Sequence, residues 1–229
     1  MRGVRAVFFD ADGTLFQSPE EIFAGALREL GYPYPPAEVR RAYEAVRPWY
    51  HEHLRRYQGR LDDLWTAFNG QVLRALGMED GGALAAAIHR VFERLGDTRL
   101  HPDVTETLAA LRDAGLVLGV ITNRRREPLG RMLRLTGIEG FFGPVATMDD
   151  YGAFKPDVRL FLLALARAGV RPAEAVHAGD VYGEDVLGAR AAGMRPVLLQ
   201  RDGAGAPPAG CEAIGTLAAL PALVLSGVR

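Results

Sequence analysis

Two pairs of carboxylates stand directly after short apolar runs of the sequence. Asp10 and Asp12 follow the first run, and Asp180 and Asp185 follow a later one. A carboxylate can act as a nucleophile, a second can donate and accept a proton, and a cluster can bind a hard cation. In an extended chain, Asp10 and Asp12 point to the same side about 6.6 Å apart, a gap that fits a phosphoryl group. Each pair alone is also compatible with a turn or a helix cap.

Two further polar sites follow the same pattern. Thr122 ends another apolar run, and its hydroxyl can donate to a phosphate oxygen or cap the helix that follows. Asn123 and Arg124 come next and are candidates for contact with a substrate. Lys155 is the only lysine among 27 basic residues, all the others being arginine. An ammonium is a compact point charge and a guanidinium a planar fork, so the retained lysine favours a specific task, such as neutralising a phosphate, over a surface position.

The charge balance of these residues indicates a metal ion. If Asp10, Asp12, Asp180 and Asp185 converge, four carboxylates face one lysine, and a phosphate dianion would be repelled. A divalent cation would correct the imbalance and lower the barrier to phosphoryl transfer. Oxygen ligands favour Mg²⁺ over zinc. Cys211 is the only cysteine, which excludes an intrachain disulfide and a cysteine-based zinc cluster within one chain.

The polar sites are expected at the carboxyl ends of parallel strands. Short apolar runs of this kind are typical of strands buried on both faces of a parallel sheet. The runs are residues 4–9, 116–122, 145–147, 176–178 and 196–199. Helical patterns separate them, and the alternation predicts a doubly wound α/β fold with a Rossmann-like parallel sheet. In such sheets, ligands bind beyond the carboxyl ends of the strands, where the polar sites fall.

Capping residues predict where helices begin. Asp103 is expected to cap a helix, with Glu106 completing a capping box. Helices are also expected over residues 157–168 and 184–192, each ended by a glycine. Residues 201–210 are expected to form a loop, because glycine and proline dominate them.

One long segment, residues 16–98, breaks the alternation, with helical patterns and no convincing strand. The expected helices are residues 19–30, 37–57, 61–76 and 83–95. Ser18 and Glu21 form a capping box for the first of them. We therefore expect residues 16–98 to be an all-α helical domain, inserted into a core of residues 1–15 and 99–229.

Four motifs of the chain resemble those of the haloacid dehalogenase superfamily. The pattern D-x-D-x-[TV] matches residues 10–14, the Ser/Thr motif matches Thr122, the lysine matches Lys155, and G-D-x(4)-D matches residues 179–185. The motifs follow the family's order and span nearly the whole chain. Residues 188–194 are also similar to the subfamily whose helical cap is inserted after the first motif, which agrees with the helical segment.

The resemblance implies a Mg²⁺-dependent phosphatase that hydrolyses a small phosphate monoester. In that reading, Asp10 attacks phosphorus and becomes a covalent aspartyl-phosphate. Asp12 protonates the leaving alcohol and then activates water. Thr122 and Lys155 hold the phosphoryl oxygens.

The resemblance also implies the ligands of the metal ion. Asp10, the backbone carbonyl of Asp12, and Asp180 are expected to bind Mg²⁺, with Asp185 supporting it directly or through water. His177 precedes this loop and is expected to pack against it or orient it. Val181 is a departure, since many relatives carry Ser or Thr after G-D, and its peripheral position leaves the reaction class intact.

The same residues bear on several rival functions. Asp12 argues against a dehalogenase, since the dehalogenases of this family lack the second acid. Residues 16–98 contain no lysine, which excludes the Schiff-base chemistry of the phosphonate-cleaving relatives. A sugar phosphomutase and a non-catalytic binding protein on the same scaffold remain alternatives.

Bulk composition limits the partners. The net charge is −1 and the basic residues form no long run, so neither nucleic acid nor an anionic membrane is expected. No run approaches the roughly 18 apolar residues that span a bilayer, and residues 1–9 do not resemble a signal peptide. We expect a soluble cytoplasmic protein, monomer or homodimer, whose partner is a small phosphorylated metabolite.

Overall fold

The computed structural model of the chain has two compact units. It describes residues 3–53, 56–57, 60–79, 82–95, 98–201 and 206–226. We call Met1–Gln17 with Thr98–Arg229 the core unit, and Ser18–Asp97 the helical unit. The chain therefore leaves the core unit after its first strand and returns to it once.

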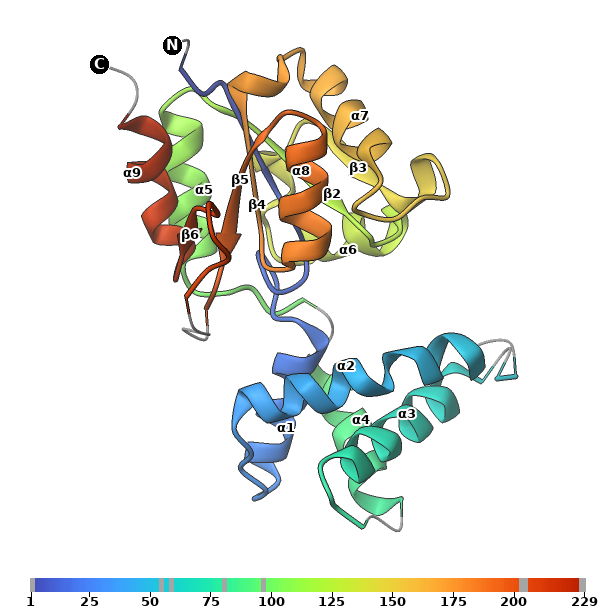
Figure 1. Ribbon diagram of the computed structural model, residues 1–229. Coiled ribbons are helices and arrows are strands. Elements are labelled where there is room, and N and C mark those ends of the chain that lie inside the picture. Colours follow the sequence, from blue (N-terminus) through green and yellow to red (C-terminus); the bar gives the residue numbers. More distant parts are fainter. Residues whose placement is uncertain are drawn as a thin grey trace. The chain divides into compact units, whose positions relative to one another are not determined.

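The core unit is built on one parallel sheet, which confirms the predicted Rossmann-like α/β fold (Figure 1). Its strands are β1 (Ala6–Phe9), β2 (Val117–Thr122), β3 (Val145–Thr147), β4 (Ala175–Gly179), β5 (Arg195–Leu199) and β6 (Ala213–Ile214). Their order is β3-β2-β1-β4-β5-β6, and each pairing is parallel. β1 thus lies between β2 and β4, and the chain segments that follow these three strands leave the same edge of the sheet.

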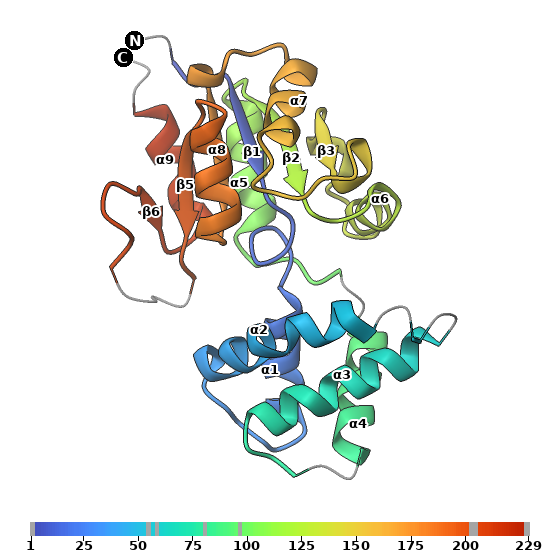
Figure 2. The same cartoon turned by 45° about the vertical axis from the view of Figure 1, so that its right-hand side comes forward.

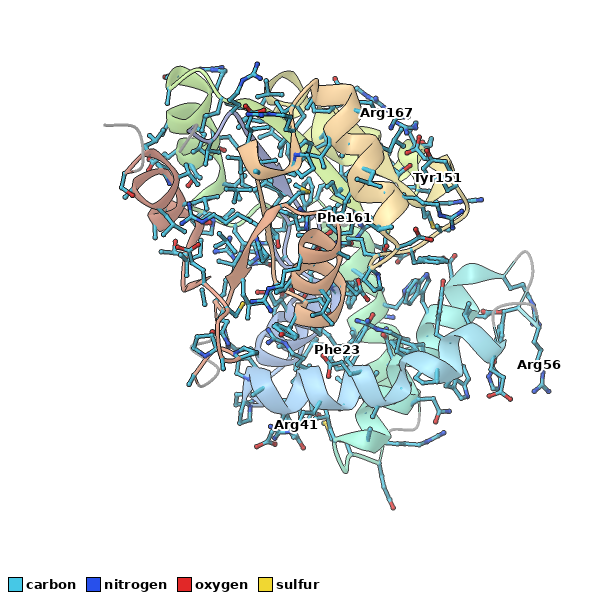
Figure 3. The ribbon with its side chains drawn as sticks, turned by 45° about the horizontal axis from the view of Figure 1, so that its top comes forward. Phe23, Arg41, Arg56, Tyr151, Phe161 and Arg167 are labelled. Atoms are coloured by element: carbon cyan, nitrogen blue, oxygen red, sulfur yellow. The ribbon has the colours of Figure 1, made fainter. Side chains whose placement is uncertain are left out.

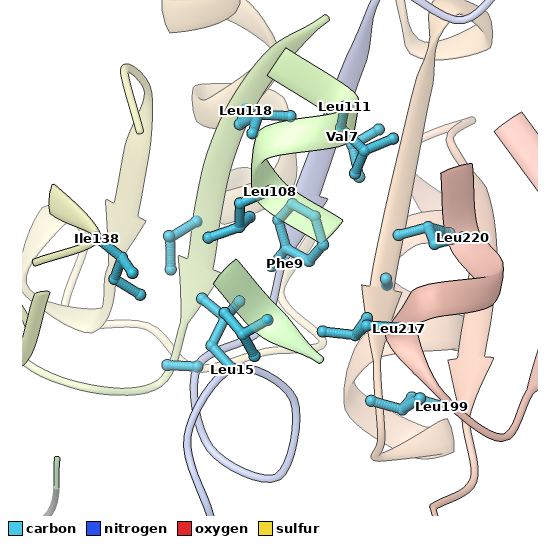
Figure 4. Packing of buried hydrophobic residues seen from close by; sticks show 14 of the residues in the cluster. Val7, Phe9, Leu15, Leu108, Leu111, Leu118, Ile138, Leu199, Leu217 and Leu220 are labelled. Carbon is cyan, nitrogen blue, oxygen red and sulfur yellow. The ribbon is translucent and has the colours of Figure 1, made fainter. Parts of the chain in front are cut away.

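Alternate residues of β1 face the two sides of the sheet. Val7 and Phe9 pack into the cluster of buried side chains that also contains Leu108, Leu217 and Leu220 (Figure 4). Ala6 and Phe8 belong to a second cluster, formed with the helices of the other face. Because side chains cover both faces of β1, all four of its residues are apolar, as is typical of a central strand of a parallel sheet.

Helices cover both faces of the sheet (Figure 2). The α-helices of the core unit are α5 (Val104–Asp113), α6 (Arg126–Leu135), α7 (Val158–Ala168), α8 (Leu187–Ala191) and α9 (Leu220–Leu225). Short helical turns are η1 (Glu139–Phe141), η2 (Met148–Asp150), η3 (Pro172–Glu174), η4 (Tyr182–Val186) and η5 (Leu217–Ala219). Buried residues of α5, α6 and α9 belong to the cluster of Val7 and Phe9, and those of α7 and α8 to the other.

Some helix boundaries differ from those the sequence predicts. α7 begins and ends as expected, since Asp157 accepts the Arg159 amide and Gly169 has a left-handed conformation. Asp103 precedes α5, but its side chain makes no capping hydrogen bond and binds Arg201 instead. The segment expected as a helix over residues 184–192 begins with the π-helical turn η4 and continues as α8. The short strand β6 was not predicted, because two residues carry too little pattern.

The helical unit contains the four expected helices, but the second, expected over residues 37–57, ends at His53, and residues 56–57 form a turn. They are α1 (Pro19–Glu29), α2 (Pro36–His53), α3 (Leu61–Ala75) and α4 (Ala83–Leu95). The predicted capping box is present, with Ser18 accepting the Glu21 amide and Glu21 accepting the Ser18 amide. The unit has its own buried cluster, in which Phe68 contacts the aromatic rings of α2 and α3. Among the described residues, no helix combines the length and apolar character needed to cross a bilayer.

Candidate active site

The candidate site lies where three neighbouring strands end. Asp10 follows β1, Thr122 is the last residue of β2, and Asp180 follows β4. Because β2, β1 and β4 are adjacent and parallel, their carboxyl ends bring these side chains to one edge of the sheet. Lys155 joins them from the loop before α7.

Lys155 lies between two carboxylates. Its Nζ is 2.6 Å from Oδ1 of Asp10 and 2.6 Å from Oδ1 of Asp185, and its side chain is 1% exposed. Burial disfavours charge on the amine, but the two carboxylates outweigh it and raise the pKa of Lys155 above its ordinary value. The single lysine of the chain is therefore a permanent buried cation beside Asp10.

Asp185 is held by three donors. Its Oδ1 accepts from Lys155 and from Nε2 of His177 at 2.9 Å, and its Oδ2 accepts from the backbone amide of Val181 at 3.0 Å. Burial opposes its ionisation, but Lys155 and His177 outweigh that cost and lower the pKa of Asp185. Gly179 makes room for it, because a Cβ there would lie 2.2 Å from Cγ of Asp185. Asp185 therefore positions Lys155.

His177 orients Asp185 from within β4. The ring is fully buried, and burial lowers the pKa of His177, which favours the neutral imidazole. A neutral ring can donate to Asp185 only with its proton on Nε2. Phe161, labelled in Figure 3, packs edge-on against this ring with 5.2 Å between centroids. His177 was expected either to pack against the loop or to orient it, and its contact with Asp185 favours the orienting role.

The ionised form of Asp10 is less stabilised by its neighbours than that of Asp185. Burial raises its pKa to about 7, with Lys155 lowering it and Asp185 and Asp12 raising it further. Carboxylate oxygens of Asp10, Asp180 and Asp185 all lie within 4.8 Å of one another. Three oxygen donors grouped so closely suit a hard divalent cation, which would also favour the ionised form of Asp10.

Asp180 is brought close to the loop after β1 by a glycine. Gly13 has a φ of +73°, and a Cβ there would lie 2.2 Å from Oδ2 of Asp180. The Thr14 hydroxyl donates to Oδ1 of Asp180 at 3.2 Å. Glycine is therefore required at position 13 for two reasons: its backbone conformation and the close approach of Asp180.

Asp12 does not join the group of three carboxylates. β1 ends at Phe9 and the chain turns, with the amides of Leu15 and Phe16 donating to the Ala11 carbonyl. The side chain of Asp12 binds Arg124, whose Nη2 donates to Oδ1 at 2.7 Å and whose Nε donates to Oδ2 at 2.7 Å. The sequence predicts four carboxylates facing one lysine if they converge. Among the described residues, Arg124 brings a second cation to Asp12.

The segment after β2 ties the site together. The Thr122 hydroxyl accepts a hydrogen bond from the backbone amide of Arg124 at 3.2 Å. The residue Thr122 is 1% exposed. Asn123 accepts the backbone amide of Lys155 on Oδ1 and donates to Glu184 at 2.7 Å. Asn123 thus holds the lysine loop. Glu184 and Thr14 were not singled out as site residues, since an acid in a first turn and a Thr after a glycine are ordinary in sequence.

Comparison with known proteins places these motifs in a family. The profile of haloacid dehalogenase-like hydrolases matches residues 4–193. Glyceraldehyde 3-phosphate phosphatase of Methanothermobacter thermautotrophicus is 32% identical over 208 residues, which are 87% of this chain and 87% of that protein. The motifs that suggested the resemblance lie within the matched residues.

Solved structures with the same fold include both a protein named a phosphatase and a protein named a dehalogenase. A HAD phosphatase from Thermococcus onnurineus superposes with a TM-score of 0.61, at 29% identity, over 96% of this chain and 97% of that one. A 2-haloacid dehalogenase from Pseudomonas syringae superposes with a TM-score of 0.60, also at 29% identity, over 99% of this chain and 100% of that one. The fold alone therefore does not separate phosphatase from dehalogenase, and the site must do so.

Proposed function

The chain belongs to the haloacid dehalogenase-like hydrolases and is a phosphoric monoester hydrolase, and we propose that it acts on small phosphorylated metabolites through an aspartyl-phosphate on Asp10 with Mg²⁺ as cofactor. One observation carries the proposal. Asp10 is a buried carboxylate next to a buried cation and to Asp180, with a second carboxylate, Asp12, two residues further on. A halide leaves without a proton, whereas an alkoxide needs one, so Asp12 favours a phosphate ester over a haloacid.

In the proposed first step, an Oδ atom of Asp10 attacks phosphorus. The bond from phosphorus to the ester oxygen breaks, and Asp12 donates a proton to that oxygen as the alcohol leaves. In the second step, water attacks the phosphorus of the acyl phosphate while Asp12 takes a proton from it. Inorganic phosphate and free Asp10 result. Lys155 and the Thr122 hydroxyl would stabilise the charge on the phosphoryl oxygens.

The residues present fit a divalent cation. Asp10 and Asp180 would hold it, together with the backbone carbonyl of Asp12, and Asp185 would support it from the same cluster of oxygens. Asp185 already accepts three hydrogen bonds, which suits a supporting role. When bound, Mg²⁺ would neutralise charge on the phosphoryl group and align it with Asp10.

The helical unit would be the part that selects the substrate. It is inserted directly after the loop that carries Asp10 and Asp12, and it has its own core. An insertion with its own core at this point can act as a cap domain that excludes water during the reaction. We propose this role for Ser18–Asp97, matching the helical cap expected over residues 16–98.

The test is release of inorganic phosphate from para-nitrophenyl phosphate by the purified chain. We expect turnover with Mg²⁺, none with EDTA, and none in Asp10→Asn, with circular dichroism showing that the variant is folded. Release of inorganic phosphate also separates hydrolysis from transfer to a second sugar hydroxyl. Equal turnover by Asp10→Asn would sink the proposal.

A further inference from the structure

Three consecutive arginines follow Asn123, and they have different partners. Arg125 pairs with Asp149 and Arg126 with Asp150, both through exposed guanidinium groups. Arg124 instead turns to Asp12, with side chains only 18% and 31% exposed. Its amide is fixed by the Thr122 hydroxyl at the end of β2. One arginine of the triplet therefore belongs to the site.

The contact occupies both carboxylate oxygens of Asp12. Nε of Arg124 lies 2.9 Å from Oδ1 and 2.7 Å from Oδ2, and Nη2 lies 2.7 Å from Oδ1. A carboxylate offers about four lone-pair sites, and these three contacts use most of them, so a substrate oxygen competes with Arg124 for Asp12. Asp12 approaches the leaving oxygen of the proposed reaction most readily when Arg124 gives up one of these contacts.

The position of Arg124 beside Asp12 also determines which part of a substrate it can contact. A proton donor must lie beside the leaving oxygen of the ester, so a cation bound to Asp12 lies on the leaving-group side. Lys155 is already held between Asp10 and Asp185 and is 1% exposed, so it is committed to the phosphoryl side. Arg124 is the more accessible cation, with the planar fork that binds carboxylate or phosphate in two-point contact.

We propose that Arg124 selects esters whose leaving alcohol carries a second anionic group, a carboxylate or a phosphate. Such a substrate replaces Asp12 on the guanidinium, exchanging one ion pair for another, and frees Asp12 to donate its proton. A neutral alcohol offers no replacement, so any Arg124–Asp12 contact that is given up stays uncompensated. The inference rests on the proposed phosphatase function and names its substrate class.

The experiment compares two esters that differ only in the second anion. These are 2-phosphoglycolate, which carries a carboxylate, and ethyl phosphate, which does not. We expect kcat/KM of the wild type to favour phosphoglycolate about tenfold to 100-fold, the range of a charged hydrogen-bonded contact. Arg124→Gln should lower that ratio towards one, and Arg124→Lys should restore part of it.

A matched control is the neighbouring arginine. Arg125→Gln removes a guanidinium that pairs only with the surface Asp149 in the contacts above, and it should leave the ratio as in the wild type. A second readout needs no variant. Phosphonoacetate should inhibit hydrolysis of para-nitrophenyl phosphate more strongly than ethylphosphonate does.

The outcomes separate this inference from the phosphatase proposal. If Arg124 binds the transferred phosphoryl group, or only balances the charge of Asp12, the variant changes both esters equally and the ratio stands. That result overturns the inference, as does a wild type that hydrolyses para-nitrophenyl phosphate without preferring phosphoglycolate. If the wild type hydrolyses none of the three esters, the phosphatase proposal fails with it.

Discussion

At the scale of single residues, Lys155 has the sharpest requirement for its chemical type. Its ammonium fills a gap between Oδ1 of Asp10 and Oδ1 of Asp185 in which the side chain is 1% exposed. Lys155→Met should lower kcat about 100-fold to 1,000-fold, since one donor to the phosphoryl group is lost. Lys155→Arg should also be poorly active, because the wider fork does not fit a gap shaped for a point charge.

Steady-state kinetics with saturating Mg²⁺ checks this prediction. Arg131→Met, on the exposed side of α6, removes a cation elsewhere and should keep wild-type kcat. Thermal unfolding in EDTA should show Lys155→Met to be less stable by about 3 kcal/mol, because two buried carboxylates lose their partner. Wild-type kcat in Lys155→Met would mean that the lysine plays no part in catalysis.

Gly13 offers a test of how the carboxylates are brought together. Gly13→Ala places a Cβ 2.2 Å from Oδ2 of Asp180, so Asp180 must move. We expect kcat/KM to fall about tenfold or more and half-maximal activity to need a higher Mg²⁺ concentration. The loss of a residue that supports a metal site typically lowers metal affinity or activity by about that factor.

Gly115→Ala is the matched control for that variant. Gly115 has a φ of +81°, close to the +73° of Gly13, and its Cβ would meet nothing within 4 Å. Both variants should lose about 1 kcal/mol of stability from the left-handed backbone, but only Gly13→Ala should lose activity. Equal activity in the two variants would contradict the account of Asp180.

The sequence predicted which residues form the candidate site, and the structure brings Asp10, Lys155 and Asp180 together, but the sequence did not predict the partner of each side chain. The motif spacing led to Asp10, Lys155 and Asp180, since each follows an apolar run. The pairing of Asp12 with Arg124 depends on a turn after Phe9, where local pattern says little about side-chain direction. A long flexible arginine can reach many acids, so only the folded chain selects one.

At the scale of elements, Asp103 links the start of α5 to the segments that follow β5 and precede η5. Its carboxylate binds Arg201 and the Thr216 hydroxyl, and Arg201 also donates to the Thr14 carbonyl at 2.9 Å. The helix start predicted from Asp103 was correct, but the capping bond was wrong, because an arginine distant in sequence competes better for the carboxylate than a helix amide. Sequence pattern detects local caps and cannot detect such a distant partner.

The network of Asp103 predicts a pH dependence of stability. Burial opposes its ionisation, but hydrogen bonds from Arg201 and Thr216 outweigh that and lower the pKa of Asp103 from 3.8 to about 2. A carboxyl group with a lowered pKa in the folded state stabilises the fold above pH 4, and this contribution disappears as the pH falls towards 2. Asp103→Asn should therefore cost about 1 to 2 kcal/mol at pH 7 after allowing for partial exposure, and little at pH 2.

Urea unfolding of both proteins at several pH values measures this difference. Asp113→Asn, at a largely exposed carboxylate of α5, should show less than about 0.5 kcal/mol at any pH. A difference between Asp103→Asn and wild type that stays constant from pH 7 to pH 2 would contradict the charge-based account.

At the scale of the whole molecule, the helical unit has a core that unfolding can report separately. Both tryptophans of the chain, Trp49 and Trp65, contact Phe68, with ring centroids 6.5 Å and 5.9 Å away. Phe68 is 2% exposed, so Phe68→Ala should destabilise this unit by about 3 to 5 kcal/mol. The urea midpoint of tryptophan fluorescence should fall, while far-UV circular dichroism, which also reports the core unit, should show a second, later transition.

Coincident transitions in Phe68→Ala by both methods would contradict this prediction, because they would mean that the units unfold as one. Leu162→Ala, at an exposed residue of α7, is a control that should leave the fluorescence midpoint unchanged. The sequence predicts a helical insertion, because the helical period of residues 16–98 interrupts the strand pattern, and the helical unit falls within those residues. Strand β6 was not, because two residues give no period.

Asp10 is proposed to carry the phosphoryl group during turnover. The most direct test is rapid acid quench during para-nitrophenyl phosphate hydrolysis with Mg²⁺, followed by peptide mass spectrometry. We expect a hydroxylamine-sensitive phosphoryl adduct on Asp10. It should accumulate in Asp12→Asn, because para-nitrophenolate is a weak base that leaves without a proton, whereas water is no longer activated for the second step. Release of inorganic phosphate by the wild type with no adduct on Asp10, in either protein at any quench time, would contradict the account.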